Sequence, residues 1–185
     1  MGIIKAPICY QNMTKENIMS KSLENLKIAF AGESQANRKY LAFAKKADEE
    51  GFPQIARLFR AAAAAETVHA NNHFRAMDGV KSTAENLDAA IAGENYEVVS
   101  MYPPMFAEAN AEGDKRASKS FEWALAVEKI HEALYRNARE ILGKGKDTPE
   151  TTYYVCPVCG FTHEGPMEGK CPVCNTPAER FEKIA

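Results

Sequence analysis

The chain has 185 residues, of which 45% are hydrophobic and 26% charged, and its formal net charge is −2. These values are typical of a water-soluble globular protein, and they give no electrostatic reason to expect nucleic acid or an anionic membrane as a partner. No uninterrupted apolar run, Ala61–Ala65 included, approaches the ~20 residues of a membrane-spanning helix. Since residues 1–19 also lack the basic start and the apolar block of a secretory signal, we expect a cytoplasmic protein.

Four helices are predicted after an N-terminal extension, residues 1–19, that we expect to be poorly ordered. Apolar residues recur at helical spacing between glycine and proline breaks, which delimits the helices. Their predicted ranges are 20–49, 53–77, 84–111 and 114–142. They form a four-helix bundle over residues 20–142, followed by a polar linker, 143–152, and a small C-terminal domain, 153–185.

The helical region is a duplicated hairpin. Residues 24–33 read ENLKIAFAGE and residues 85–94 read ENLDAAIAGE, an offset of 61, whereas the matches from the second hairpin turn onward have an offset of 62. One extra residue therefore lies between Glu94 and Gly113. Because this stretch contains Pro103–Pro104, we expect a distorted helix there, in the form of a π-bulge.

Each copy of the repeat contains a Glu-x-x-His pair and a glutamate upstream of it. Residues three apart share one face of a helix, so each pair presents a carboxylate and an imidazole to the same point. Counted from the hairpin turns, both sets lie at one level along the helices. Such a set is the ligand set of a carboxylate-bridged dimetal centre in a four-helix bundle, and its oxygen-rich chemistry suits iron or manganese. The six predicted ligands are Glu33, Glu66, His69, Glu94, Glu128 and His131.

Three further residues lie within reach of this centre. Glu97 breaks the repeat, because the equivalent position of the first copy is Ala36. One turn from Glu94, it would make the two metal ions inequivalent, unless it is merely a solvated helix residue. Tyr40 and Tyr102 could donate a hydrogen bond or a proton to a bound oxidant, and the alternative for both is core packing.

Four of the five cysteines form two Cys-x-x-Cys pairs, Cys156 with Cys159 and Cys171 with Cys174. In a cytosolic protein this spacing favours one tetrahedral metal ion with four thiolate ligands over disulfides. The ligands alone leave both zinc and iron open. Residues 153–185 hold too few apolar side chains for an independent core, so a metal ion must stabilise them. We assign no role to Cys9.

In these motifs the chain resembles the rubrerythrins. The resemblance covers residues 20–185, and the segments that carry it are AGESQ, ETVH, AGENYE, MYPP, EKIH and CPVCGFTHEG followed by CPVC. It implies a ferritin-like four-helix domain with two iron ions and a rubredoxin-like domain with one iron at the cysteines. It also implies a non-haem di-iron peroxidase that reduces hydrogen peroxide to water in oxidative stress defence. Electrons would come from NAD(P)H through a reductase or rubredoxin.

The same resemblance implies a role for each ligand. Glu66 and Glu128 would bridge the two irons, while Glu97 and His69 would exchange on one iron as its oxidation state changes. Glu33 would stay bound to the iron on which this exchange takes place. Glu94 and His131 would stay bound to the other iron. Electrons would pass from the cysteine-bound iron to the di-iron centre of a partner subunit, because we expect the C-terminal domain to lie away from the helices of its own chain.

The connection between the second and third helices is short. Residues 78–83 can span only ~20 Å when fully extended, whereas helices of ~25 residues run nearly 40 Å. A plain up-down-up-down bundle is one solution. The other is a homodimer or higher homo-oligomer in which the first helix pair of one chain packs on the second pair of its partner. We favour exchange, since rubrerythrins with short linkers are similar in this respect.

Three other functions use parts of the same pattern. Iron oxidation and storage, as in ferritins, needs a similar helical site but has no use for the four cysteines. A zinc-ribbon interaction module would use the cysteines alone. Reduction of dioxygen would use the same residues as reduction of peroxide.

Overall fold

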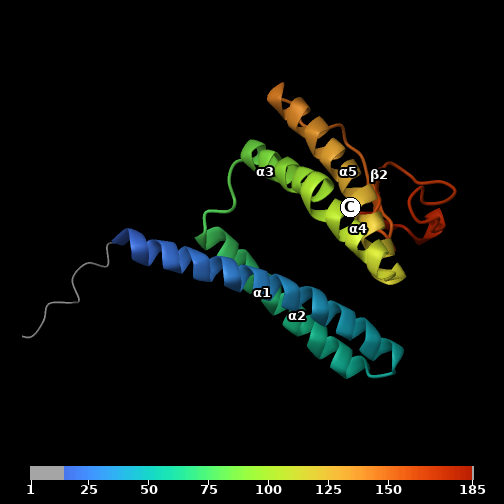
Figure 1. Ribbon diagram of the computed structural model, residues 1–185, viewed down its shortest axis with the longest axis horizontal. Helices are drawn as coiled ribbons and strands as arrows, with labels where there is room; N and C mark the ends of the chain where they lie inside the picture. Colours follow the sequence, from blue (N-terminus) through green and yellow to red (C-terminus); the bar gives the residue numbers. More distant parts are fainter. Residues whose placement is uncertain (1–14, 185) are drawn as a thin grey trace, which may run out of the picture. The chain divides into compact units, whose positions relative to one another are not determined.

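The computed structural model describes residues 15–184, with side chains from residue 21 onward (Figure 1). The chain is mainly helical, with four helical segments followed by a small three-stranded domain, which confirms the predicted fold class. It divides between Val80 and Lys81 into two compact units, each described here by itself. Within residues 15–184, no helix has the length and apolar character needed to cross a membrane.

The first unit is a hairpin of two long helices, α1 (Lys15–Glu49) and α2 (Pro53–Ala76). Gly51 allows the turn, because its φ of 82° lies in the left-handed region that side chains disfavour. Pro53 occupies the first turn of α2, where its missing N–H costs nothing. Helix α1 begins earlier than the predicted start at residue 20; residues 1–14 of the predicted extension, with Cys9, lie outside the described residues.

Small side chains bring α1 and α2 close together. The buried apolar side chains of the described part of the hairpin are all alanines, namely Ala44, Ala47, Ala56, Ala63 and Ala70. Many large apolar side chains of the same hairpin are exposed instead, among them Ile28 at 72%, Leu58 at 68% and Val68 at 56%. A hairpin of this kind needs a further apolar surface to cover these side chains.

Asn37 ties the two helices together. Its side chain is only 7% exposed, and its amide donates hydrogen bonds to the Ala63 carbonyl at 2.7 Å and to Thr67 Oγ1 at 2.8 Å. Buried polar groups stabilise a fold when they are satisfied in this way. Asn37 therefore sets the register of α1 against α2 near the predicted metal ligands.

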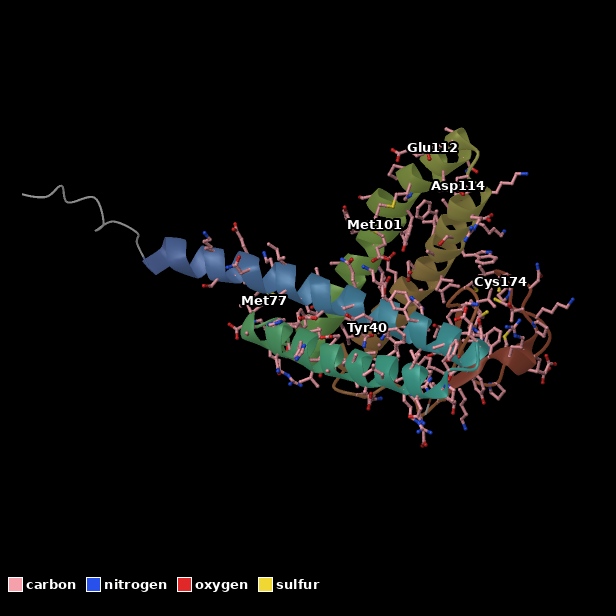
Figure 2. The ribbon with its side chains drawn as sticks, turned by 90° about the horizontal axis from the view of Figure 1, so that it is seen from below. Tyr40, Met77, Met101, Glu112, Asp114 and Cys174 are labelled. Atoms are coloured by element: carbon pink, nitrogen blue, oxygen red, sulfur yellow. The ribbon has the colours of Figure 1, made fainter. Side chains whose placement is uncertain are left out.

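The second unit begins with helix α3 (Thr83–Tyr96), which continues into the π-helix η1 (Glu97–Met101), α4 (Tyr102–Glu112) and, after a turn, α5 (Lys115–Gly143). Ser82 and Glu85 form a reciprocal capping box at the start of α3. Gly113 ends α4 with a φ of 73°, and Glu112 and Asp114 flank that turn in Figure 2.

The π-helix is the distortion that the repeat predicts. Tyr40 lies seven residues after Glu33, whereas Tyr102 lies eight residues after Glu94, so the extra residue belongs to this segment. Beyond it the two copies are again in register. The same aromatic contact occurs in both at a ring-centroid distance of 6.3 Å, Tyr40 with Phe59 and Tyr102 with Phe121.

The C-terminal domain is a sheet of three short antiparallel strands in the order β2-β1-β3, with a short 3-10 helix, η2 (Ala178–Arg180). The strands are β1 (Tyr153–Val155), β2 (Thr162–Glu164) and β3 (Glu182–Ile184).

The sheet domain packs on helix α5 of its own chain. The buried cluster of Cys156, Phe161 and Cys171 includes Val127 of α5, and Ile130 packs against it. The expectation that this domain lies away from the helices of its own chain is therefore wrong. The physical reason is its small apolar content, because Phe161 is covered only when the helix completes the core.

Replacing Asn37 by alanine should lower the free energy of unfolding by about 1–3 kcal/mol, because it deletes two hydrogen bonds between the helices, one buried and one partly buried. Urea unfolding followed by circular dichroism measures the change. Asn72→Ala, at an exposed position of α2, is the matched control and should stay within about 0.5 kcal/mol of the parent. Equal losses in both variants would show that Asn37 has no special role.

Candidate metal centres

The first unit brings together one predicted ligand from α1 and two from α2. His69 Nδ1 lies 2.8 Å from Glu66 Oε2 and 3.9 Å from Glu33 Oε1. The three ligand atoms lie within 4.8 Å of one another, which is close enough for all of them to contact one cation. The His69 side chain is 52% exposed, so this half-site is open on one side.

The second unit repeats this arrangement with Glu94 from α3 and with Glu128 and His131 from α5. His131 Nδ1 lies 2.7 Å from Glu128 Oε2 and 4.0 Å from Glu94 Oε1. The side chain of His131 is 27% exposed, half as much as that of His69. The duplicated sequence thus yields two half-sites of the same geometry, each with two carboxylates and one imidazole.

Burial and mutual repulsion perturb the acidic groups of the second half-site. Burial, together with the charge of Glu128, raises the pKa of Glu94 to about 7. The same causes raise the pKa of Glu97. The hydrogen bond between Glu128 and His131 lowers the pKa of the glutamate and raises that of the histidine. Carboxylates crowded in this way are stabilised by a bound cation, so the donor set fits a metal ion.

The structure places the three additional candidates differently. Glu97, the first residue of the π-helix, lies near enough to Glu128 for their charges to interact, but it is not one of the three clustered ligands. Burial and the charges of nearby glutamates, Glu97 first among them, raise the pKa of the Tyr102 phenol. Tyr40 packs against Phe43 and Phe59. The roles of these residues as ligands or proton donors stay predictions.

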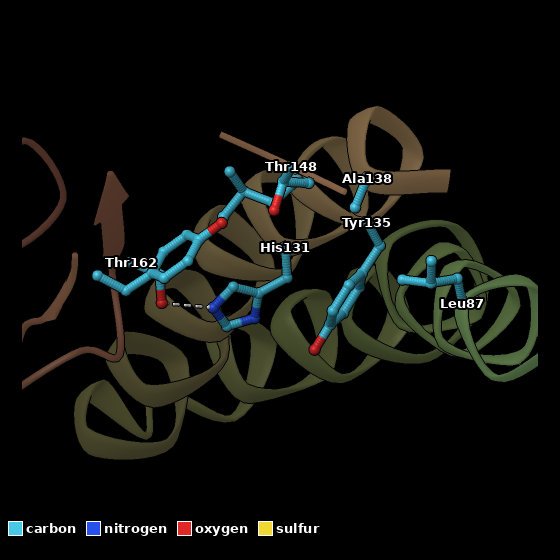
Figure 3. A pocket seen from close by; sticks show the side chains of 8 residues that line it. Leu87, His131, Tyr135, Ala138, Thr148 and Thr162 are labelled. Carbon is cyan, nitrogen blue, oxygen red and sulfur yellow. Dashed lines mark hydrogen bonds between the residues drawn. The ribbon is translucent and has the colours of Figure 1, made fainter. Parts of the chain in front are cut away.

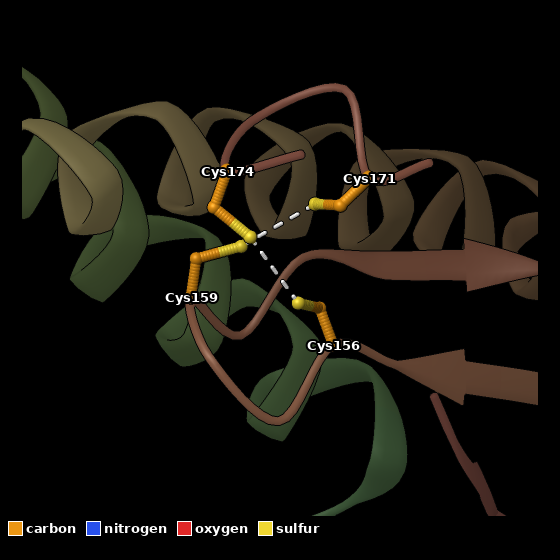
Figure 4. A group of neighbouring side chains, drawn as sticks. All are labelled: Cys156, Cys159, Cys171 and Cys174. Carbon is orange, nitrogen blue, oxygen red and sulfur yellow. Dashed lines mark hydrogen bonds between the residues drawn. The ribbon is translucent and has the colours of Figure 1, made fainter. Parts of the chain in front are cut away.

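The four cysteines converge on one point in the C-terminal domain (Figure 4). Cys156 Sγ lies 3.5 Å from Cys174 Sγ, and Cys159 Sγ lies 3.5 Å from Cys171 Sγ. A tetrahedral ion with metal–sulfur bonds of about 2.3 Å separates its ligands by about 3.8 Å, so this spacing fits a single ion. Disulfide bonds do not link these cysteines.

The thiols differ in acidity. Although burial opposes ionisation, hydrogen bonds with the side chain and backbone of Thr176 lower the pKa of Cys174 to about 6. Burial raises the pKa of Cys159 well above its ordinary value. Because one thiolate is present at neutral pH, a metal ion can bind there first and displace the remaining protons.

Sequence reasoning missed one residue that contacts the helical half-site. Thr162, on strand β2, places its Oγ1 atom 2.9 Å from His131 Nε2 (Figure 3). The two residues are 31 positions apart, and no periodicity relates them. Only the packing of the sheet domain on α5 brings them together.

Two half-sites of carboxylates and imidazole, with a separate cluster of four cysteines, define a class of non-haem metalloprotein. Residues 24–139 match the family model described as rubrerythrin, and residues 154–182 match the model of the rubrerythrin rubredoxin-like domain. The chain belongs to the rubrerythrin family, and it is a non-haem di-iron oxidoreductase of that family. The clusters are consistent with a di-iron site and an Fe(SCys)4 site.

Related proteins match over almost the whole chain. Rubrerythrin-2 of Clostridium acetobutylicum is 34% identical, over 92% of this chain and 99% of the relative. Nigerythrin of Nitratidesulfovibrio vulgaris is 36% identical, over 92% of this chain and 94% of the relative. A solved structure of nigerythrin in its fully reduced, all-ferrous state matches with a TM-score of 0.53 at 36% identity, covering 88% of this chain and 86% of that one.

The raised pKa of Glu94 predicts how pH affects the stability of the metal-free protein. The folded state favours protonated Glu94, so its stabilising contribution is complete below the ordinary pKa of 4.5 and is lost as pH rises through about 7. Glu94→Gln keeps a neutral side chain at every pH. The metal-free variant should therefore gain thermal stability over the metal-free parent as pH rises from about 5 to 8.

Thermal unfolding of both metal-free proteins across this pH range measures the effect. Adding Mn²⁺ above pH 7 should reverse the order, because the cation replaces the proton on Glu94 but finds no carboxylate in the variant. A difference in melting temperature that does not depend on pH would contradict the assignment.

Proposed function

We propose that this protein is a peroxidase that reduces hydrogen peroxide to water at its di-iron site. Reducing equivalents would come from NAD(P)H through a reductase or a rubredoxin. The observation that carries the proposal is the pairing of a duplicated carboxylate and imidazole site with a four-cysteine domain packed on one of its helices. Iron storage would need the first site without the second.

The reaction consumes one peroxide molecule, two electrons and two protons, breaks the O–O bond and yields two water molecules. When bound, iron at the two kinds of site supplies the electron-transfer chemistry. Four glutamates and two histidines, the clustered ligands of both half-sites, would hold the di-iron pair, and the four cysteines would hold the third ion.

Tyr102 and Glu97 are the candidates for proton transfer near the second half-site. Burial and nearby carboxylates raise the pKa of Tyr102, so its phenol stays protonated at neutral pH and can donate a hydrogen bond. Burial also raises the pKa of Glu97, which makes its carboxyl group a better proton carrier near neutral pH. Both side chains lie among the charges of the half-site without belonging to its three clustered ligands.

The test is anaerobic turnover of the iron-loaded, full-length protein with hydrogen peroxide, NADH and a rubredoxin reductase system. We expect oxidation of one NADH per peroxide. Zinc at the four cysteines keeps the domain folded but cannot change its oxidation state. This form should lose NADH-coupled turnover, while its prereduced helical site should still be oxidised once by added peroxide.

Dioxygen is the control oxidant, and it should react more slowly than peroxide with the same prereduced protein. Coupled turnover that survives zinc substitution would refute the role of the cysteine site. A prereduced helical site that is inert to peroxide would refute the proposed function.

We also propose that the dimetal centre is assembled from two copies of the chain by exchange of helix pairs. Each half-site offers only three clustered ligands, so a dimetal centre needs both. The connection from α2 to α3 has six residues, 77–82, and spans about 20 Å when extended. Helix α2 alone, with 24 residues, is about 36 Å long. The exposed apolar side chains of the α1/α2 hairpin give a partner hairpin a surface to cover.

Complementation tests the exchange. In an exchanged dimer, Glu66→Ala and Glu128→Ala homodimers lack a ligand at every site. Mixed dimers instead combine the two intact halves in one of their two sites. Co-expressed variants should therefore recover about a quarter of the helical-site metal and of the peroxidase activity. A fully metallated monomer, or no recovery in isolated mixed dimers, would contradict exchange.

A further inference from the structure

Both ring nitrogens of His131 have partners within the second unit. Nδ1 faces Glu128 Oε2 at 2.7 Å, while Nε2 lies 2.9 Å from Thr162 Oγ1 (Figure 3). Thr162 belongs to strand β2 of the four-cysteine domain, so this contact joins the two candidate metal centres of the unit. Neither the repeat nor the Cys-x-x-Cys pattern assigns a role to this threonine.

The direction of the hydrogen bonds follows from a third partner. The Thr162 hydroxyl donates its proton to the Gly160 carbonyl at 3.1 Å. Its oxygen then accepts a proton from His131, which places that proton on Nε2. Nδ1 faces the clustered carboxylates, and in the metal-free protein it donates a proton to Glu128; a metal ion that displaces this proton meets the lone pair of Nδ1, while Nε2 keeps its own proton.

We propose that Thr162 is a positioning residue that keeps the proton of His131 on Nε2 and presents Nδ1 to the metal ion. The inference rests on the proposed role of His131 as a ligand, and it does not depend on the substrate. Partners of this kind fix the tautomer and orientation of metal-binding histidines.

The position of the Thr162 hydroxyl is set by packing. Phe161 and Cys156 are buried against Val127 of α5, one turn before His131. The backbone of β2 is paired with β1, which aligns Thr162 with Val155. The packing on α5 and the pairing with β1 therefore both fix the position of the hydroxyl group relative to the imidazole ring.

The imidazole ring needs such an anchor, because a cavity adjoins it. A cavity of about 350 Å³ lies beside His131, lined by the apolar Leu87, Leu134 and Ala138 and by residues that carry hydroxyl groups, namely Tyr135, Thr148, Tyr153 and Thr162. Of these hydroxyl groups, that of Thr162 forms the hydrogen bond with the ring. Without the hydroxyl, the ring has room to turn and could present Nε2 to the ion.

His69 provides an internal comparison. It belongs to the equivalent Glu-x-x-His pair, and its Nδ1 contacts Glu66 at the same kind of distance, 2.8 Å. In the described part of its own unit, however, its outer nitrogen makes no hydrogen bond, and its side chain is 52% exposed. The anchored histidine and the unanchored one make the two half-sites unequal, although their sequences are duplicated.

The experiment uses the full-length protein with diamagnetic zinc at the cysteines, and Zn²⁺ is titrated into the helical site. Long-range ¹⁵N NMR of the imidazole rings shows which nitrogen of His131 carries the proton. Competition with a chelator gives the affinity for Zn²⁺. A His131→Gln sample assigns the signals.

We expect the parent protein and Thr162→Ser to show one tautomer, with the proton on Nε2 and zinc on Nδ1. Thr162→Val preserves the shape of the side chain but removes the hydroxyl. It should bind Zn²⁺ about 10–100-fold more weakly and should lose the single tautomer, whereas the signals of His69 stay unchanged.

Thr162→Ser separates loss of the hydrogen bond from a general loss of structure, because serine keeps the hydroxyl group and lacks only the methyl group of threonine. Unchanged ¹⁵N shifts and zinc affinity in Thr162→Val would overturn the inference. So would an equal loss in Thr162→Ser. Neither result bears on turnover with peroxide, so a failure of the proposed function would be recognised separately.

Discussion

Crowding of negative charge is the constraint on which the rest of the structure depends. Each helix pair gathers two carboxylates and an imidazole within 4.8 Å, and in the second pair burial, together with the charge of Glu128, raises the pKa of Glu94. Protons and bound cations both stabilise carboxylates that are crowded in this way. In the first pair, the buried alanines and Asn37 hold α1 and α2 close together. They thereby keep the acidic side chains of both helices near one another despite their mutual repulsion. The architecture of the helical domain thus follows from its need to hold metal ions.

The C-terminal domain also depends on a bound metal ion, because its own core is small. Its buried residues are two of its own cysteines, one phenylalanine and one threonine. Such a core cannot fold a segment of this length without an ion and a neighbouring surface. Helix α5 supplies that surface through Val127, and the same contact places Thr162 against His131. The packing that completes the core of the C-terminal domain therefore also supports His131.

The duplicated sequence predicts most of the fold and most of the clustered residues. Helical spacing and identical motifs place three ligands in each hairpin, and a single extra residue predicts the π-helix at Glu97. The Cys-x-x-Cys pairs likewise predict the four-cysteine cluster. Local periodicity carries no information about contacts between remote segments, which is why the docking of the sheet domain and the partner of His131 escaped prediction. The early start of α1 at Lys15 was missed because residues 15–19 lack a clear helical pattern.

Because the sheet domain packs on α5, the spacing between the cysteine cluster and His131 does not depend on the loop before α3. The cysteine cluster and His131 belong to one compact body, joined by Phe161, Val127 and Thr162. A change in the length of the loop before α3 would leave the spacing between these two elements unchanged, because that loop lies outside the packed body. This spacing is therefore fixed within a single chain, by the packing of one small domain on one helix.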